Sequence, residues 1–250
     1  MADRQKTLIF AHRGANREAA ENTRSAFEHA LAYAVDGIET DVQLSRDEIP
    51  VLWHDRFLAQ LGWPLKRIDD FNWAQLQKMH FPVPYTESNQ SQALLRLDEF
   101  IASYRQRCGL LIEIKNRDWE EKARHQIKVR LTLAILGVAA GSDIMVSSFN
   151  LPSLIYAHQC APQFPLIYNV ESDQNVEEVQ RVLAEQPFLY GLCLPIAILD
   201  QQLVDLLRGQ GKKIAIYTCN SDQEINRALN FGVDILITDV PQQALRMRDQ

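Results

Sequence analysis

Short apolar runs alternate with longer amphipathic stretches along almost the whole chain of 250 residues, and this alternation constrains the fold more than any other feature. Runs with strand composition that are each followed by helical periodicity indicate repeated β-strand and α-helix units, which build a parallel sheet. The predicted strands are Leu8–Ala11, Gly37–Leu44, Ile49–His54, Gly109–Lys115, Asp143–Ser147, Pro165–Asn169, Leu189–Leu194, Lys213–Thr218 and Asp234–Thr238.

Helix signals fill most of the gaps between these strands. Thr23 is a good helix-capping residue, and after it Phe27, Ala30, Leu31 and Ala34 form an apolar stripe at helical spacing. The predicted helices are Arg24–Val35, Asp98–Gln106, Trp119–Gly137, Leu151–Gln159, Asn175–Gln186, Asp200–Gly209 and Asp222–Phe231.

The second and third predicted strands have only residues 45–48 between them, which is too short for a crossover helix. They must therefore form an antiparallel hairpin. Eight βα units remain, which predicts a (β/α)8 barrel of the TIM type with a hairpin on its second strand. An open, doubly wound sheet is the alternative. If the turn is tight around Arg46 and Asp47, His54 lies directly across from Glu39, and Leu52 lies across from Asp41.

The segment from Asp55 to Arg96 lacks a clear βα unit and contains Trp63, Trp73 and three prolines. A loop of this length in a compact barrel is usually functional. We predict a single barrel domain over residues 1–250, with an insertion at about 56–96 that caps the active face.

Composition excludes several classes of function. The chain has 26 Lys and Arg against 32 Asp and Glu, a net charge of −6, and no basic cluster that would follow a nucleic-acid backbone. Apolar runs are too short for a membrane-spanning helix. The first residues carry no apolar leader, which predicts a cytoplasmic protein. The cysteines form no C-x-x-C pair and are predicted to be reduced core residues: Cys108, Cys160, Cys193 and Cys219.

Charged residues concentrate at the ends of the first predicted strands, where a barrel has its active mouth. The clusters are His12-Arg13, Glu39-x-Asp41, His54-Asp55 and Glu113-x-Lys115. Residues two apart in a strand share a face, so Glu39 and Asp41 point the same way, as do Glu113 and Lys115. A single pair of this kind is more often a structural ion pair, but four clusters at strand ends indicate a site.

Three carboxylates at one point repel one another unless a cation neutralises them. Oxygen ligands from Glu39, Asp41 and Glu113 favour Mg²⁺, Ca²⁺ or Mn²⁺ over zinc. Arg13 and Lys115 suit an anionic substrate, and two histidines supply an acid and a base near neutral pH. The combination predicts cleavage of a phosphoryl ester.

Other residues receive structural interpretations. His29, His80, His125 and His158 are predicted to lie at the surface or to pack, Cys219 to fill the core, and Asp239 to cap the loop after the last strand. The apolar residues of the insertion are predicted to fold it, although they also suit a hydrophobic lip at the mouth: Phe57, Leu58, Leu61, Trp63 and Phe71.

At these residues the chain resembles the glycerophosphodiester phosphodiesterase family, and within it the small cytosolic bacterial enzymes. The matching segments, in order, are Ala11-His-Arg-Gly14, Glu21-Asn-Thr23, Gly37-Ile-Glu-Thr-Asp-Val42, Pro50-Val-Leu-Trp-His-Asp55, Ile112-Glu-Ile-Lys115, Ser147-Ser-Phe149, Ile216-Tyr-Thr-Cys-Asn220 and Gly232-Val-Asp-Ile-Leu-Ile-Thr-Asp-Val-Pro241.

The resemblance implies a single phosphodiesterase barrel that uses one divalent cation, Mg²⁺, Ca²⁺ or Mn²⁺, to hydrolyse glycerophosphodiesters to sn-glycerol 3-phosphate and an alcohol. It implies that Glu39, Asp41 and Glu113 bind the metal, that His12 and His54 act as acid and base, and that Arg13 and Lys115 contact phosphate. Asn22 matches the Glu-Asn-Thr segment and is expected near the metal or in ordering the first loop.

The chain departs from the family pattern at Ala20, at Asp47-Glu48, in residues 56–62 and at Tyr217. The last two shape the substrate pocket, so the alcohol is left open, as are the attacking group (water or the glycerol 2-hydroxyl) and the oligomeric state. The alternatives are a lysophospholipase D-like or phosphoinositide-type phosphodiesterase, and a barrel that binds phosphodiesters without cleaving them. The expected partner is a small-molecule glycerophosphodiester, with no nucleic acid and no membrane span.

Overall fold

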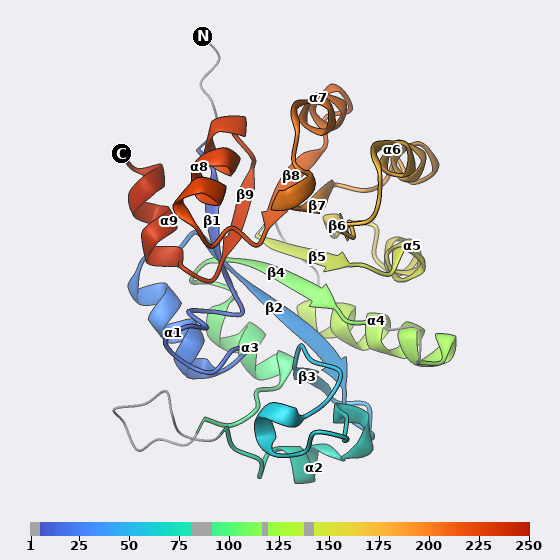
Figure 1. Ribbon diagram of the computed structural model, residues 1–250. Coiled ribbons are helices and arrows are strands. Elements are labelled where there is room, and N and C mark those ends of the chain that lie inside the picture. The colour runs from blue at the N-terminus through green and yellow to red at the C-terminus, as the bar shows by residue number, and fades with distance from the viewer. Residues whose placement is uncertain (1–5, 82–91, 117–119, 138–142) are drawn as a thin grey trace.

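Eight parallel strands form a closed barrel in the computed structural model, which describes residues 6–81, 92–116, 120–137 and 143–250 (Figure 1). The first strand pairs with the last and with the second, so the sheet closes on itself. The barrel prediction is confirmed, and the open sheet is excluded. The barrel strands are β1 (Leu8–His12), β2 (Gly37–Leu44), β4 (Gly109–Ile114), β5 (Ile144–Ser148), β6 (Leu166–Asn169), β7 (Gly191–Pro195), β8 (Lys213–Tyr217) and β9 (Ile235–Thr238).

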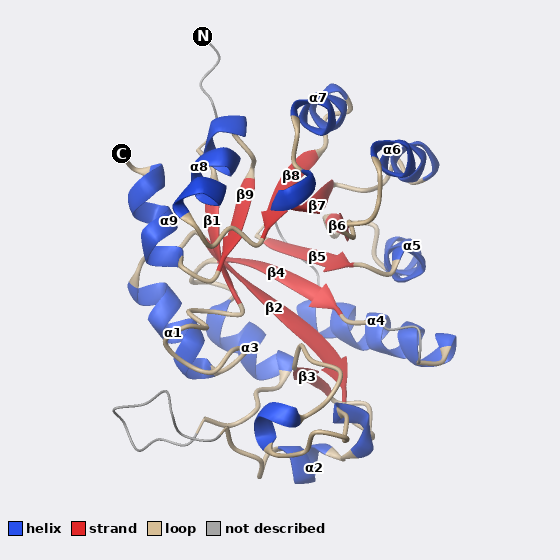
Figure 2. Cartoon of the chain, viewed as in Figure 1, coloured by secondary structure: helices blue, strands red, loops and turns tan. Residues whose placement is uncertain are grey.

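Helices surround this barrel (Figure 2). They are α1 (Arg24–Ala32), α3 (Leu97–Tyr104), α4 (Lys122–Leu136), α5 (Leu151–Cys160), α6 (Val176–Glu185), α7 (Gln201–Gly209), α8 (Asp222–Phe231) and α9 (Pro241–Arg248). The described part of the chain contains no helix that is long and apolar enough to cross a membrane.

Two helix boundaries differ from the predictions by three residues, and the others by at most two. The first predicted helix ends at Ala32 rather than Val35, because Ala34 takes a positive φ of 59° that a helix cannot continue. The fourth helix begins at Lys122, and Trp119, where we predicted its start, lies outside the described residues. Helix α9 was not predicted, although its first residue, Pro241, fits the first turn of a helix.

Apolar side chains fill the barrel interior in place of a pore. The members of this cluster are Phe10, Leu111, Met145, Ile167, Cys193, Ala215, Ile235 and Ile237. Gly37 is required beside the Phe10 ring, because a Cβ at this position would lie 2.3 Å from the ring. The interior is therefore closed at the Phe10 end, and a ligand has room only at the carboxyl ends of the strands.

The hairpin between β2 and β3 (Pro50–Leu52) is present, but its predicted register is wrong by one residue. Leu52 pairs with Val42, not with Asp41, and His54 lies beyond the last ladder pair rather than across from Glu39. The turn holds one residue more than a tight turn around Arg46 and Asp47, because the Ser45 amide donates to the Ile49 carbonyl. Glu48 allows this with a φ of +60°.

The inserted segment packs around a small core of its own. It contains two 3-10 helices, η1 (Ala59–Leu61) and η2 (Ile68–Asp70), and the short helix α2 (Trp73–Leu76). The core joins Val51 and Trp53 of the hairpin to buried residues of the segment: Leu58, Leu61, Ile68, Leu76, Phe81 and Leu94. Residues 82–91, with two of the three prolines and most of the polar tract, lie outside the described residues. We propose that residues 56–96 are an insertion within one barrel domain, because this core is continuous with β3.

Candidate active site

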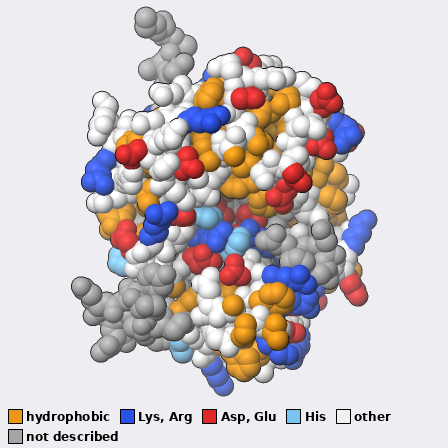
Figure 3. Space-filling view, viewed as in Figure 1, with side chains coloured by type: hydrophobic (Ala, Val, Ile, Leu, Met, Phe, Trp, Pro, Cys, Tyr) orange, Lys and Arg blue, Asp and Glu red, His pale blue; other side chains and the backbone are white. Residues whose placement is uncertain are grey.

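A cavity of about 170 Å³ opens at the carboxyl ends of the barrel strands. The space-filling view shows charged and histidine side chains gathered in a hollow at this end, with hydrophobic side chains beside it (Figure 3). The residues that line the cavity are His12, Arg13, Glu39, His54, Leu111, Glu113, Lys115, Ser147, Phe149, Asn169, Cys193, Tyr217, Thr218 and Ile237.

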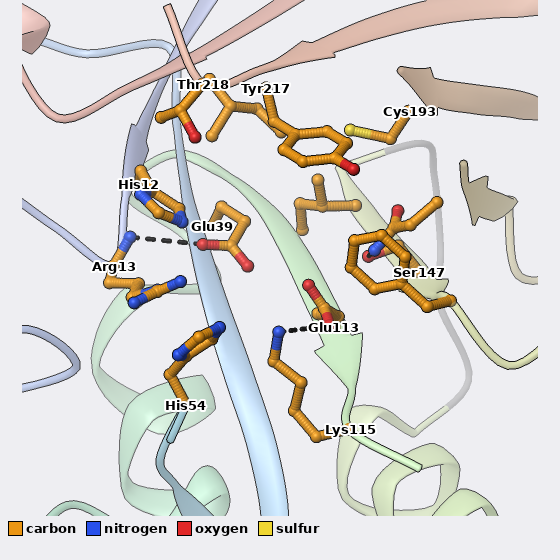
Figure 4. A pocket seen from close by; sticks show the side chains of 14 residues that line it. His12, Arg13, Glu39, His54, Glu113, Lys115, Ser147, Cys193, Tyr217 and Thr218 are labelled. Carbon is orange, nitrogen blue, oxygen red and sulfur yellow. Dashed lines mark hydrogen bonds and ion pairs between the residues drawn. The ribbon is translucent and has the colours of Figure 1, made fainter. Parts of the chain in front are cut away.

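Three buried carboxylates stand together at one side of this cavity. Glu39 and Asp41 come from β2, and Glu113 of β4 is the ladder partner of Asp41. Ligand oxygens from all three lie within 4.8 Å of one another. The structure thus brings together the three predicted metal ligands, and two of them, Glu39 and Glu113, lie on the cavity wall (Figure 4).

Lys115 and Arg13 neutralise part of this charge. The Lys115 ammonium lies 2.9 Å from Asp41 Oδ1 and 2.5 Å from Glu113 Oε1. Arg13 Nε lies 3.1 Å from Asp41 Oδ2. Burial would raise the pKa of Asp41, but Lys115 and Arg13 outweigh burial and hold that pKa well below its ordinary value.

Glu39 has the opposite electrostatic balance. It is only 4% exposed, and burial together with the charges of Asp41 and Glu113 raises its pKa well above the ordinary value. Its hydrogen bond from the Arg13 amide is 3.3 Å long. The positive charges near Glu39 are therefore too weak to balance its burial and the two neighbouring carboxylates.

These residues fit a divalent cation. Asp41 Oδ1 and Glu113 Oε1 are buried oxygens that both face the Lys115 ammonium, at 2.9 and 2.5 Å, so one lysine serves two carboxylates. The donor atoms are all carboxylate oxygens, which suit Mg²⁺, Ca²⁺ or Mn²⁺. A dication would supply the charge that Glu39 lacks.

An unusual loop after β1 holds Arg13 in place. Arg13 and Asn22 both have positive φ angles, 56° and 59°. The backbone N–H of Asn22 donates to the backbone carbonyl of Arg13 at 3.1 Å. Gly14 lets the loop approach α1 closely, because a Cβ there would lie 2.6 Å from the backbone of Ala26. This tight loop directs Arg13 Nη1 to Glu21 at 2.9 Å while Nε reaches Asp41.

Asn22 lies beside the metal candidates, as expected. Its amide nitrogen donates to Asp41 Oδ2 at 3.0 Å, and its amide oxygen accepts from the Thr40 hydroxyl at 2.7 Å. Asn22 thus orients Asp41 and orders the first loop together with Arg13.

His12 is oriented by Asp239, a residue for which we predicted a different role. Asp239 Oδ1 lies 2.6 Å from His12 Nδ1, and Asp239 also accepts hydrogen bonds from Asn16 and Asn220, each at 2.7 Å. Burial would raise the pKa of Asp239, but these hydrogen bonds and the His12 charge lower it to about 2. The prediction that Asp239 caps the following loop is wrong, because the Thr238 hydroxyl accepts from the Val240 amide instead.

The position of Asp239 carried a usable signal. It directly follows the last barrel strand, which is the same placement that identified the four polar clusters earlier in the chain. Asn16 and Asn220 were missed for a different reason, since neutral amides in loops give no charge signal.

His54 reaches the cavity although its predicted pairing is wrong. Its Nδ1 lies 2.9 Å from Asp55 Oδ1. Gln43 of β2 holds this segment, because its amide nitrogen donates to the carbonyls of Trp53, His54 and Asp55 at 3.0, 3.1 and 2.9 Å. In Figure 4, His54 and His12 both face the cavity near Arg13.

The opposite wall of the cavity is largely apolar. The Tyr217 hydroxyl donates to the Val170 carbonyl at 2.7 Å, and its ring meets Phe149 edge-on at 5.8 Å. The Lys115 ammonium lies 5.7 Å from the centre of the Phe149 ring. Burial raises the pKa of the Cys193 thiol well above its ordinary value, so it stays neutral.

Among the remaining histidines, the four cysteines and the described residues of the insertion, Cys193 alone lines this cavity. His158 stacks on Phe188 at 4.3 Å, and His29 is exposed. All four cysteines are free, but Cys160 is exposed, so its assignment to the core is wrong, because it ends a helix at the surface. In the insertion, Leu58 and Leu61 are buried, as a folding role requires, while Trp63 is 46% exposed.

Comparison with known proteins agrees with this geometry. A glycerophosphodiester phosphodiesterase from Bacillus altitudinis is 28% identical and covers 98% of this chain and 99% of its own. A phosphodiesterase from Oleispira antarctica, solved in complex with the product sn-glycerol-3-phosphate, is 26% identical, with a TM-score of 0.86 and 98% of each chain covered.

A further solved structure, a putative glycerophosphoryl diester phosphodiesterase from Silicibacter pomeroyi, shares the fold with a TM-score of 0.86 at 21% identity over 99% of this chain and 94% of its own. Residues 12–243 match the profile of the glycerophosphoryl diester phosphodiesterase family. The chain therefore belongs to this family and is a phosphodiester hydrolase by that membership.

Proposed function

We propose that this chain hydrolyses glycerophosphodiesters to sn-glycerol 3-phosphate and an alcohol, with a divalent cation and with His12 and His54 as acid and base. One observation carries the proposal: two histidines, two cationic side chains and two carboxylates line a single cavity in a chain that matches the family over residues 12–243. The product bound by the Oleispira relative supports the same substrate class.

The two histidines are set up alike for proton transfer. Each has Nδ1 beside a carboxylate, Asp239 for His12 and Asp55 for His54. This arrangement fixes the imidazole so that Nε2 is directed at the cavity. One histidine takes a proton from the attacking hydroxyl, and the other gives a proton to the leaving alkoxide.

The charged groups hold the phosphodiester between these histidines. Arg13 and Lys115 line the cavity and attract the phosphoryl oxygens. A divalent cation held by Glu39, Asp41 and Glu113 would stabilise the negative charge that develops on those oxygens. The attacking group is water or the glycerol 2-hydroxyl. Detection of a cyclic glycerol phosphate intermediate would indicate attack by the 2-hydroxyl, because attack by water does not form one.

The test is release of glycerol 3-phosphate from glycerophosphocholine and glycerophosphoethanolamine by protein stripped with EDTA. Mg²⁺, Ca²⁺ and Mn²⁺ are then added back one at a time. We expect release only with a cation, and from both substrates. Undiminished release by the metal-free protein would refute the metal requirement.

The same assay separates the alternatives. Cleavage of lysophosphatidylcholine or glycerophosphoinositol in preference to both substrates would favour the lysophospholipase D-like or the phosphoinositide-type reaction. Binding of glycerol 3-phosphate without cleavage of any substrate would favour a barrel that only binds.

A further inference from the structure

Two buried polar side chains in the cavity wall lack good partners. Asn169, at the end of β6, is 4% exposed, and its Oδ1 accepts no hydrogen bond from the described residues. Its Nδ2 reaches only the hydroxyl of Ser147 on β5, at 3.5 Å, the limit for a hydrogen bond. Because an unsatisfied buried amide costs folding free energy, such a group needs a physical reason, and a ligand supplies one.

These two residues lie across the cavity from the reacting groups. In the ring of eight barrel strands, β6 is four steps from β1 in either direction. Asn169 is therefore opposite His12, and the carboxylates on β2 and β4 lie between them along one side. A phosphoryl group held by Arg13 and Lys115 leaves the Asn169 side of the cavity for one of its two ester substituents.

The surroundings of Asn169 suit a small polyol as the ester substituent on this side of the cavity. Its neighbours on the wall include Phe149, Cys193 and Tyr217, and the Tyr217 hydroxyl is already engaged with Val170. At about 170 Å³, the cavity is smaller than the ~300–1,000 Å³ of sites for drug-sized ligands. This part of the cavity therefore fits a short carbon chain that carries a hydroxyl at its far end.

We propose that Asn169 and Ser147 form the subsite for the glycerol half of the substrate and bind its terminal hydroxyl, the one farthest from phosphorus. The inference rests on the proposed function and deepens it. The alcohol half then lies toward the open side of the cavity, so the enzyme selects for glycerol and accepts different alcohols.

The test compares glycerophosphocholine with the phosphocholine ester of propane-1,2-diol, in which a methyl group replaces the terminal CH2OH. The analogue keeps the 2-hydroxyl, so it supports either route of attack. We expect the protein to prefer glycerophosphocholine by about 10- to 100-fold in kcat/KM, since a buried amide without its partner disfavours the deoxy substrate.

Asn169→Leu keeps the number and branching of the side-chain heavy atoms and removes the amide. We expect this variant to lose the preference: kcat/KM for glycerophosphocholine falls by about 10-fold or more while that for the analogue changes by less than about 3-fold. Ser147→Ala is the milder second variant and lowers the same preference by a smaller factor. Asn226→Leu, at an exposed position of α8, is the matched control and keeps the preference.

Two results would overturn the subsite. One is an equal rate on both substrates by the unmodified protein, and the other is an equal loss on both substrates in Asn169→Leu, which would indicate a structural role. If neither substrate is cleaved with any cation, the proposed function is wrong, and calorimetric titration decides the subsite. Tighter binding of glycerol 3-phosphate than of propane-1,2-diol 1-phosphate, lost in Asn169→Leu, would support it, and equal binding would refute it.

Discussion

The two halves of the chain contribute different residues to one cavity. Strands β1 to β4 and their loops carry the charged groups, from His12 to Lys115, whereas β5 to β9 provide a mostly apolar wall with Phe149, Asn169 and Tyr217. Asp239 is the exception, a carboxylate from the end of the second half that acts on His12. We therefore propose that the first half performs the chemistry and that the second half shapes the substrate pocket.

The largest expected effect is in the charged half. His12→Ala and His54→Ala should each lower kcat by about 10²- to 10⁴-fold, because each removes an acid or a base at the reacting centre. Steady-state assays with glycerophosphocholine measure this, with the exposed His29→Ala as the control. Near-normal turnover in both variants would assign the chemistry to other residues.

Glu39→Gln should lower activity by at least about 100-fold while leaving the metal-free fold no less stable. Burial and the charges of Asp41 and Glu113 raise the pKa of Glu39, so its ionised form is unfavourable in the absence of a cation. Thermal unfolding in EDTA should therefore show a melting temperature equal to or above that of the unmodified protein. Glu177→Gln, at an exposed position, is the control and should change neither the activity nor the melting temperature in EDTA. A large drop in melting temperature in EDTA would contradict the electrostatic argument.

Asp239→Asn tests the carboxylate that connects the second half of the chain to His12. It should lower kcat by about 10- to 100-fold with little change in KM, because it misorients His12 without touching the substrate. Combined with His12→Ala, it should cause little further loss. Additive losses in the double variant would show that Asp239 acts independently of His12.

The same residue gives a pH dependence. Hydrogen bonds lower the pKa of Asp239 to about 2 from its ordinary 3.8, so the ionised form stabilises the fold above the ordinary pKa and this contribution disappears as the pH falls through about 2. The stability advantage of the unmodified protein over Asp239→Asn should shrink between about pH 4 and pH 2. Urea unfolding over that range measures it, and a pH-independent difference would rule out the ionised carboxylate as its source.

The smallest effect is expected in the apolar half. Tyr217→Phe removes a hydroxyl that is bound to Val170 and not to the substrate, so activity should stay within about 3-fold while stability falls by about 1 kcal/mol. A loss as large as that of the histidine variants would break the comparison, because it would place chemistry in the second half.

Much of the fold follows from sequence because each βα unit repeats the same local pattern. The strands were predictable from their apolar runs alone. The hairpin was predictable because the gap between its two strands is too short for a helix. Its register depended on the left-handed backbone at Glu48, which propensity does not identify. A shift of one residue in register moves a side chain to the other face of the sheet. His54 enters the cavity only because the chain leaves the β2–β3 pairing at Leu52, two residues earlier.

The charged part of the candidate site was predictable for a similar reason, since a charge at the end of a buried strand is costly unless it is paired or binds a ligand. Lys115 shows the limit of this reasoning: the sequence placed it in the site beside Glu113, but its contact with Asp41 depends on the distance between two strands. Asn169 gave no signal at all, because a neutral amide becomes informative only when its missing partner is seen.

The contact between His12 and Asp239 joins residues 227 positions apart, one at the end of the first barrel strand and the other directly after the last. During synthesis, residues 235–239 leave the ribosome long after the carboxylates and both histidines. A growing chain therefore holds these charged groups without an oriented His12 until residues 235–239 have emerged. If His12 acts as we propose, full activity begins only when the ring of strands closes, and enzymatic turnover then reports that the last strand of the barrel has joined the first.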